Sequence, residues 1–224
     1  ILAALGYENY TETEVNEYCK LLLEGSGAVD RKVSIGIHNA LIVNHDYSLK
    51  PAFAESLTSY YDAYVKSADF SKKTTLNQIN DWCSEKSGGM IPSVMKDLNP
   101  NAVMYALNCI YFKARWTNKF LPNNTAKENF TDIDGKAQQV MMMNAEERYL
   151  LSENGTWKTL AIPFSRGQYN MYVLLPEDGK SISDMMSALD EESWENALSS
   201  MKSRMVNLKL PKFETTTSVS LNEV

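Results

Sequence analysis

The fold class is decided by one stretch of the chain, AVMYALNCIYF, at residues 102–112. Apolar side chains occupy both alternating faces of this run, and a strand of that kind is typical of the centre of a sheet that is covered on both sides. Only Asn108 interrupts the apolar pattern. The sequence therefore predicts a buried central strand with a single amide side chain near its middle.

Two interpretations of Asn108 stay open. An unpaired amide inside such a strand would cost about 1–3 kcal/mol, so the side chain is expected to have a partner. Asn108 either makes one local hydrogen bond to the backbone, or it belongs to a buried polar network that breaks and re-forms when the sheet changes. The sequence alone favours neither.

Helix and strand patterns alternate on both sides of this run. A capping box over residues 11–14 opens a helix that is expected to end near Leu23, and Pro51 suits the first turn of the next helix. Further helices are expected from residue 75 to the glycines at 88–89, and twice between the turn at 176–179 and residue 201. Strands are expected at 33–43, 64–70, 171–175 and 206–210. Because no repeat or linker interrupts the pattern, residues 1–224 are predicted to form a single α+β domain.

Both ends of the sequence resemble interrupted helices. Residues 1–6 have the pattern of a last helical turn closed by glycine, without the beginning of that helix. Residues 220–223 have the pattern of a capping box, but the helix it would open is absent. The domain is therefore predicted to be incomplete at both ends, with native segments expected before and after it.

Composition excludes several classes of protein. The net charge of −6 does not suggest the basic face of a nucleic-acid-binding protein. No stretch is long and apolar enough to span a membrane, so neither nucleic acid nor membrane is an expected partner. The three cysteines, an odd number, do not form a disulfide framework, and they are predicted to be buried or half-buried thiols.

No catalytic or metal-binding motif is convincing. The sequence has neither a nucleophile elbow nor a phosphate-binding loop, and its two histidines, His38 and His45, lie seven residues apart across a strand and its exit. Residues 132–135 resemble the start of a calcium loop, but the remaining ligands are missing and a β-turn is the favoured interpretation. The chain is therefore predicted not to be an enzyme and to have no catalytic residue, no metal site and no cofactor.

Several motifs carry a family resemblance. The run NCIYFKARW, residues 108–116, closely resembles the serpin run N-A-x-Y-F-K-G-x-W. Further matches follow in chain order: the spacing of Phe120, Thr125 and Phe130, the run VMM at 140–142, and VNLKLPKF at 206–213. Upstream, residues 39–41 and 79–91 resemble the family's N-A-L and I-N-x-W through G-K-I segments. The departures are mild, with cysteine at 109 and alanine at 114 where the family has alanine and glycine.

The resemblance implies the serpin fold, with a large central, mostly antiparallel sheet, helices, and a smaller β-barrel or sheet region. Relative to a serpin, residues 1–224 lack the first three helices. They also lack the fifth strand of the main sheet, the reactive-centre loop and the last barrel strands. The segment that selects the protease is therefore expected to be absent from this chain.

The resemblance also implies a function. A serpin is a suicide substrate that traps a serine or cysteine protease as an acyl-enzyme, by inserting its cleaved reactive loop into the central sheet. The expected partners are the target protease and the missing segments of the same protein, which is expected to be a monomer. The alternative is a non-inhibitory serpin that acts as a carrier, binding protein or chaperone. An extracellular, periplasmic or cell-surface location is expected, with the cytoplasm as the alternative.

Three residues take roles by resemblance alone. Asn108 matches the "shutter" at the centre of the sheet, and Trp116 matches the "breach" where the loop first enters. Lys212 matches a breach lysine that often pairs with a glutamate at the base of the loop. The simpler interpretations are a core amide, a core aromatic residue and a surface lysine. Phe112, Phe120, Thr125 and Phe130 occupy further positions of the family motif.

Overall fold

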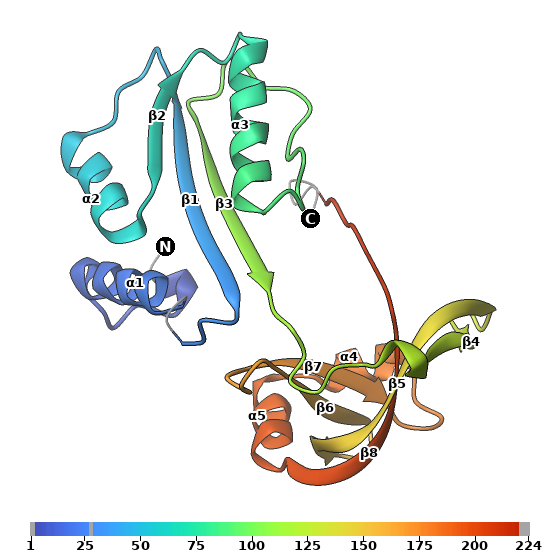
Figure 1. Ribbon diagram of the computed structural model, residues 1–224. Helices are drawn as coiled ribbons and strands as arrows, with labels where there is room; N and C mark the ends of the chain where they lie inside the picture. Colours follow the sequence, from blue (N-terminus) through green and yellow to red (C-terminus); the bar gives the residue numbers. More distant parts are fainter. Residues whose placement is uncertain (1–2, 27–28, 220–224) are drawn as a thin grey trace. The chain divides into compact units, whose positions relative to one another are not determined.

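A three-stranded sheet organises the first half of the structure, a computed structural model that describes residues 3–26 and 29–219. Its central strand is β1 (Ser34–Asn44), which pairs in parallel with β2 (Tyr64–Ala68) and antiparallel with β3 (Met104–Lys113). Figure 1 shows β1 between its two neighbours. The register places Asn39 directly opposite Asn108. Strands were therefore correctly predicted at all three places.

The helices of this half follow the expected start signals. They are the short 3-10 helix η1 (Ala3–Leu5), α1 (Glu12–Ser26), α2 (Pro51–Tyr61) and α3 (Lys73–Lys86). The predicted capping box is present, because the Thr11 backbone N donates to Glu14 Oε2 at 2.8 Å and the Glu14 N donates to Thr11 Oγ1 at 3.3 Å. Pro51 occupies the first turn of α2, as expected. The first helix runs three residues beyond its predicted end.

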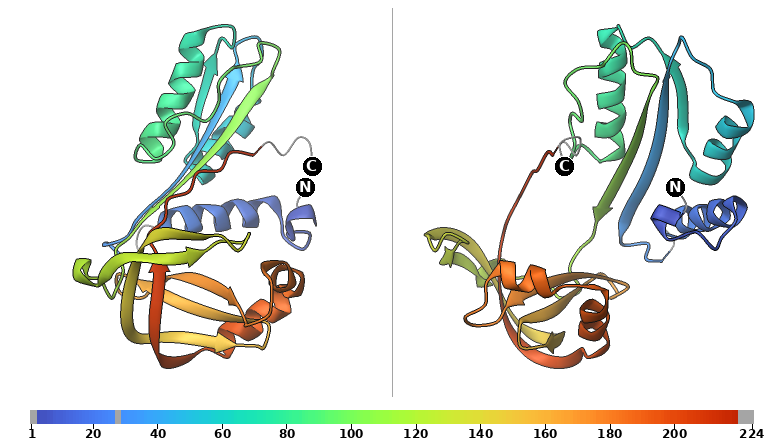
Figure 2. Two further views of the ribbon diagram at one scale, coloured as in Figure 1. Left: turned by 90° about the vertical axis from the view of Figure 1, so that its right-hand side faces the viewer. Right: turned by 180° about the vertical axis from the view of Figure 1, so that it is seen from behind.

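One face of the three-stranded sheet is covered by α3, which Figure 2 shows beside the strands. Ile79 of α3 packs with Ala40 and Ile42 of β1 and with Phe70 in a buried cluster. Tyr105 and Leu107 of β3 pack against the same cluster, and so do several partly buried neighbours. The side chains of Tyr105 and Leu107 on β3 therefore belong to the core of this half.

The even-numbered face of β3 corrects the expectation of burial on both sides. Ile110 is 66% exposed, and Met104, Asn108 and Phe112 are exposed as well. Among the described residues, β3 lies at the edge of the sheet instead of its centre, and these side chains remain exposed although Leu41 and Val43 of β1 are buried on the same face. The prediction of a strand is confirmed, and its edge position agrees with the expectation that this chain lacks the neighbouring fifth strand. The predicted burial on both faces is wrong for the described residues.

A five-stranded antiparallel sheet organises the second half. It contains β4 (Thr125–Thr131), β5 (Ala137–Glu153), β6 (Trp157–Phe164) and β7 (Tyr169–Pro176) in that order, and β8 (Lys202–Pro211) pairs with β5. The helical elements here are η2 (Pro122–Asn124), α4 (Ile182–Ala188) and α5 (Glu191–Ser199). Ser181 and Asp190 cap α4 and α5 through complete capping boxes.

The core of the second half consists of Tyr149, Leu160, Ile162, Leu208 and Leu210. The predicted alternation in β8 is confirmed, since Leu208 and Leu210 are buried while Asn207 and Lys209 are exposed. The predicted turn at 132–135 is confirmed too: the Gly135 N donates to the Asp132 carbonyl at 3.0 Å, and Gly135 has a φ of +76°, which suits glycine.

The α+β class is confirmed, and the sheets among the described residues do not close into a barrel. Backbone contacts divide the chain into two compact units, Ile1–Ala114 and Arg115–Val224. A single domain over 1–224 stays a prediction, and the helix start expected at 220–223 lies outside the described residues. None of the described helices combines the length and the apolar character needed to cross a membrane.

Candidate functional site

A pair of asparagine side chains joins the two long strands of the three-stranded sheet. Asn108 Nδ2 on β3 donates to Asn39 Oδ1 on β1 at 2.9 Å, and Asn39 Nδ2 donates to the Tyr61 carbonyl oxygen at 2.9 Å. The register sets up this contact, because directly opposed residues of an antiparallel pair present their side chains on the same face. Asn108 thus belongs to a side-chain network and not to a single local backbone bond.

The network continues through the residue that ends α2. The Tyr61 hydroxyl donates to Asn16 Oδ1 on α1 at 2.7 Å. Burial raises the pKa of Tyr61, and the neighbouring Cys19 raises it further, so the phenol keeps its proton and remains a donor. The chain of contacts therefore links β3, β1, α2 and α1. Asn108 itself is exposed among the described residues, which corrects the expectation that its amide is buried.

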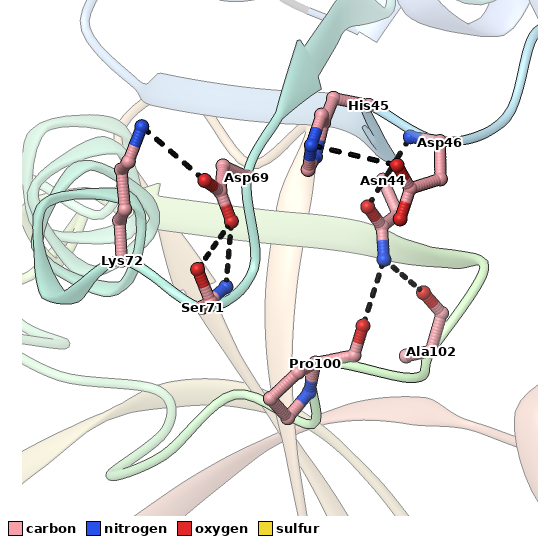
Figure 3. A network of polar contacts seen from close by, with 8 residues as sticks. All are labelled: Asn44, His45, Asp46, Asp69, Ser71, Lys72, Pro100 and Ala102. Atoms are coloured by element: carbon pink, nitrogen blue, oxygen red, sulfur yellow. Dashed lines mark hydrogen bonds and ion pairs between the residues drawn. The ribbon is translucent and has the colours of Figure 1, made fainter.

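A second polar cluster, drawn in Figure 3, fastens the other end of β1. Asn44 is only 3% exposed, and its Nδ2 donates to the carbonyl oxygens of Pro100 and Ala102 at 2.8 and 3.0 Å. Its backbone N donates to the Val103 carbonyl at 2.9 Å. Asn44 therefore fixes the end of β1 to the segment that enters β3. The role of Asn44 was not predicted, although an asparagine directly after the apolar run 40–43 was a usable signal.

The start of α3 is positioned by Asp69 in the same region (Figure 3). Its carboxylate accepts hydrogen bonds from the Ser71 N at 2.9 Å and the Ser71 Oγ at 2.6 Å, and Lys72 Nζ lies 3.2 Å away. The bonds from Ser71, with Lys72 adding to them, lower the pKa of Asp69 to about 2. The helix that covers the sheet is therefore preceded by a charged turn.

Trp116 lies in an aromatic cluster of the second unit. Its ring stacks on Phe164 with the centroids 4.4 Å apart, and it meets Phe120 edge-on at 5.9 Å. The Thr117 N donates to the Pro163 carbonyl at 2.9 Å and so holds this segment against β6. Trp116 and Phe120 both pack against the buried core of the five-stranded sheet. The structure thus brings these two motif residues together, whereas Asn108 belongs to the other unit.

The remaining motif residues lie in β3, in β4 and just after β8. Lys212 is exposed just after β8, and its backbone N donates to the Met141 carbonyl at 2.8 Å. Within residues 3–26 and 29–219, its ammonium group makes no ion pair. Thr125 begins β4, and its Oγ1 donates to the Leu121 carbonyl at 3.2 Å. Phe112 and Phe130 are both 40% exposed on their strands.

The two histidines do not meet at a common site. Burial lowers the pKa of His38, and the nearby Lys86 lowers it further, so this imidazole is held neutral. His45 is exposed, with its Nε2 3.5 Å from Asp46 Oδ1. In the described part of the chain, no group of three or more His, Cys, Asp or Glu side chains could hold a metal ion.

Comparison with known proteins places these features in a family. The family model described as Serpin (serine protease inhibitor) matches residues 1–224. An uncharacterized serpin-like protein of Thermococcus kodakarensis is 30% identical over 203 residues, which are 90% of this chain and 46% of that protein. The plasma serine protease inhibitor of Homo sapiens is 28% identical over 229 residues, covering 100% of this chain and 56% of the inhibitor.

Solved structures agree on the fold. The latent state of tengpin, a thermophilic serpin, superposes with a TM-score of 0.88 at 25% identity, covering 99% of this chain and 60% of tengpin. Human thyroxine-binding globulin in complex with its ligand superposes with a TM-score of 0.82 at 24% identity, covering 95% of this chain and 56% of the globulin. The chain spans about half the length of the curated relatives it matches.

Proposed function

The chain belongs to the serpin family, and from that premise we propose that the complete protein inhibits a serine or cysteine protease as its suicide substrate. The protease serine or cysteine attacks a peptide bond of an exposed loop outside residues 1–224 and becomes an acyl-enzyme. The loop then inserts as a new strand in the sheet before water hydrolyses the ester or thioester. Catalytic chemistry is supplied by the protease, and the inhibitor supplies the change of shape.

The edge of β3 that faces away from β1 supports this proposal, because by resemblance it is the edge at which the third and fifth strands of the main sheet part to admit the loop. In the described residues β1 occupies one edge of β3, and the other edge has no strand beside it. A free edge presents a row of unpaired N–H and C=O groups, which is the template that an added strand requires. The edge extends over Met104–Lys113, long enough to pair with a segment of about ten residues.

The asparagine pair supplies a reason why the edge responds to strand insertion. Asn108 is bonded to Asn39 across the strand pair, and Asn39 is bonded in turn to the end of α2. A strand arriving beside β3 changes the surroundings of Asn108 and therefore biases this network. In this proposal Asn108 is the shutter residue. Trp116, stacked on Phe164, is the breach residue, and Lys212 pairs with an acidic group at the base of the loop.

The test is a gel assay with the complete protein. Incubation with trypsin-like, elastase-like and papain-like proteases should give, with at least one of them, a covalent complex that survives boiling in detergent and migrates above both components. A smaller band of cleaved inhibitor should accompany it, and the cleaved form should melt at a higher temperature because the inserted strand completes the sheet. Cleavage by every protease without a trapped complex or a higher melting temperature would rule out inhibition.

That outcome would favour the second candidate, a serpin that carries or binds another molecule. The observation behind this candidate is the fold shared with thyroxine-binding globulin, a structure solved with its ligand bound. Location outside the cytoplasm and a monomeric state are further parts of the proposal. Fractionation of the native source and sedimentation of the complete protein test them.

A further inference from the structure

Two of the three cysteines lie on elements that pack against each other. Cys83 is on α3 and Cys109 is on β3, and they are only 4% and 3% exposed. Both are free thiols. The two buried thiols therefore lie on the two sides of one helix–sheet interface.

Two contacts between α3 and β3 fix the relative direction of the helix and the strand. At one end, Ile79 of α3 belongs to the buried cluster against which Leu107 of β3 packs. At the other end, Gly88, just beyond α3, approaches the Tyr111 ring so closely that a Cβ would lie 3.1 Å from the Tyr111 Cε2. The helix and the strand therefore run in the same direction between these two contacts.

The two cysteines lie level with each other between these contacts. Cys83 follows Ile79 by four residues on the same face of the helix, a rise of about 6 Å. Cys109 follows Leu107 by two residues on the same face of the strand, a rise of about 7 Å. The pKa values of both thiols are raised by burial, and that of Cys83 is raised further by Cys109, which agrees with their close approach.

We propose that Cys83 and Cys109 form a redox modification site, at which a peroxide converts the two thiols into a disulfide that ties α3 to β3. The proposal does not depend on the inhibitory function proposed above. A bond of this kind requires Cα atoms within about 7 Å, so its formation would require α3 and β3 to approach that closely at the level of the two cysteines.

The chemistry balances with hydrogen peroxide as the oxidant. One cysteine loses its proton, and its thiolate attacks a peroxide oxygen; the O–O bond breaks, and hydroxide leaves as a sulfenic acid forms. The second thiolate then attacks the sulfenic sulfur, and its hydroxyl group leaves as hydroxide. The two protons released by the thiols neutralise the two hydroxide ions. Overall, two thiols are oxidised and one peroxide molecule is reduced to two water molecules.

Cys19 provides a matched control within the same unit. It lies on α1, is half-buried and neighbours Tyr61, so it has no cysteine opposite it among the described residues. Oxidation of Cys19 should therefore give an oxygen-containing acid of cysteine or a disulfide between two molecules. Oxidation of Cys83 and Cys109 should give a disulfide within one molecule.

The test is a peptide map of the complete wild-type protein after the folded protein has been treated with hydrogen peroxide. Digestion without reductant should release one peptide that joins the segments containing Cys83 and Cys109, and reduction should separate it. The number of free thiols among these three cysteines should fall from three to one in the wild type, and from two to none in Cys19→Ser. Cys83→Ala and Cys109→Ala should each abolish the cross-link.

A second readout uses no variant. The cross-linked wild type should melt about 5 °C higher than the reduced protein, and dithiothreitol should reverse the gain. Two results would overturn the proposal: Cys83 and Cys109 that oxidise to separate sulfinic acids without a joined peptide, or a disulfide that involves Cys19 instead. Retention of all three thiols under conditions that oxidise exposed methionines would overturn it as well.

Discussion

The strands β3 and β5 are both long, with 10 and 17 residues, but they differ in what lies beside them. β5 has partner strands on both edges: Met142 and Met143 pair with β4 on one side and with β8 on the other, whereas residues 144–149 pair with β8 alone. Near its end, Leu150 and Leu151 are likewise held between β6 and β8. β3 has β1 on one edge and, within the described residues, nothing on the other. One strand is thus enclosed and the other is open.

In the proposed mechanism, the sheet of β3 gains a strand and the sheet of β5 does not. A strand that is paired on both edges has no backbone groups left for a newcomer, whereas an open edge offers all of them. The buried core around Ile162 supports the enclosed strand, and the exposed side chain of Ile110 marks the open one. We therefore assign the proposed strand insertion to the sheet of β3 and a static role to the sheet of β5.

The largest expected effect concerns residues 1–224 expressed alone. The open edge of β3, with Ile110 and Phe112 exposed beside it, should make this chain self-associate or stay partly unfolded. Light scattering and size-exclusion chromatography measure this. Ile110→Lys should reduce association by placing a charge on the open strand. Leu150→Lys, at an exposed position of β5 that is paired on both edges, should leave it unchanged. A monomeric wild-type chain with a cooperative melt would contradict the comparison.

Truncating one apolar side chain in each sheet is the next test, made in the complete protein. Ile162 is only 1% exposed, and Ile162→Ala should lower the free energy of unfolding by about 2–5 kcal/mol. If segments outside residues 1–224 cover this face of β3, as the apolar pattern of the strand predicts, Ile110→Ala should cost a comparable amount. Chemical denaturation measures both. A cost below about 0.5 kcal/mol for Ile110→Ala would show that this face stays open to solvent.

The asparagine pair should have a smaller effect. Asn108→Ala removes one hydrogen bond and should cost about 0.5–1.5 kcal/mol. Asn39→Ala removes two bonds and should cost more, and the double variant should be less than additive because the two residues share a bond. Both single variants of the complete protein should polymerise faster on mild heating. Asn207→Ala, an exposed strand position on β8, is the control. Equal polymerisation rates for wild type and variants would make Asn108 an ordinary strand amide.

The smallest expected effect is a pH dependence of the protein's stability that arises from Asp69, just before α3. The pKa of Asp69 is lowered to about 2 in the folded state, from an unfolded value near 4. The unfolded chain therefore binds the proton first as the pH falls. The stability that Asp69 contributes is complete above about pH 4 and is lost between pH 4 and pH 2. In thermal melts, Asp69→Asn should lower stability slightly at neutral pH and flatten the stability curve between pH 4 and pH 2. A curve of unchanged slope would contradict the assigned contacts of Asp69.

Much of the fold was predictable because its signals are local. The capping box at Thr11, the proline at the start of α2 and the alternation of Leu208 and Leu210 each depend on a few neighbouring residues, and all were confirmed. The position of β3 was not predictable in this way. Apolar residues on both faces of a strand indicate that both faces are buried in the complete protein. They do not show whether the covering segments lie within residues 1–224.

The candidate site shows the same limit. Asn108 was found because it interrupts an apolar run, but its partner Asn39 and the connection to Tyr61 depend on strand register, which no local pattern reveals. Asn44 was missed because its two carbonyl partners lie more than fifty residues away. The roles of Trp116 and Lys212 stay predictions, since they concern a loop outside residues 1–224.

Hydrogen exchange of the complete protein, before and after cleavage of its reactive loop by a protease, tests the central claim most directly. The claim is that the inserted strand pairs with the edge of β3 that β1 does not occupy, after the fifth strand expected beside that edge has moved away. Backbone amides of β3 that do not pair with β1 should become strongly protected after cleavage, while amides of β5 and β8 should keep the protection they had. Unchanged protection along Met104–Lys113 in a protein whose loop has been fully cleaved would contradict the account.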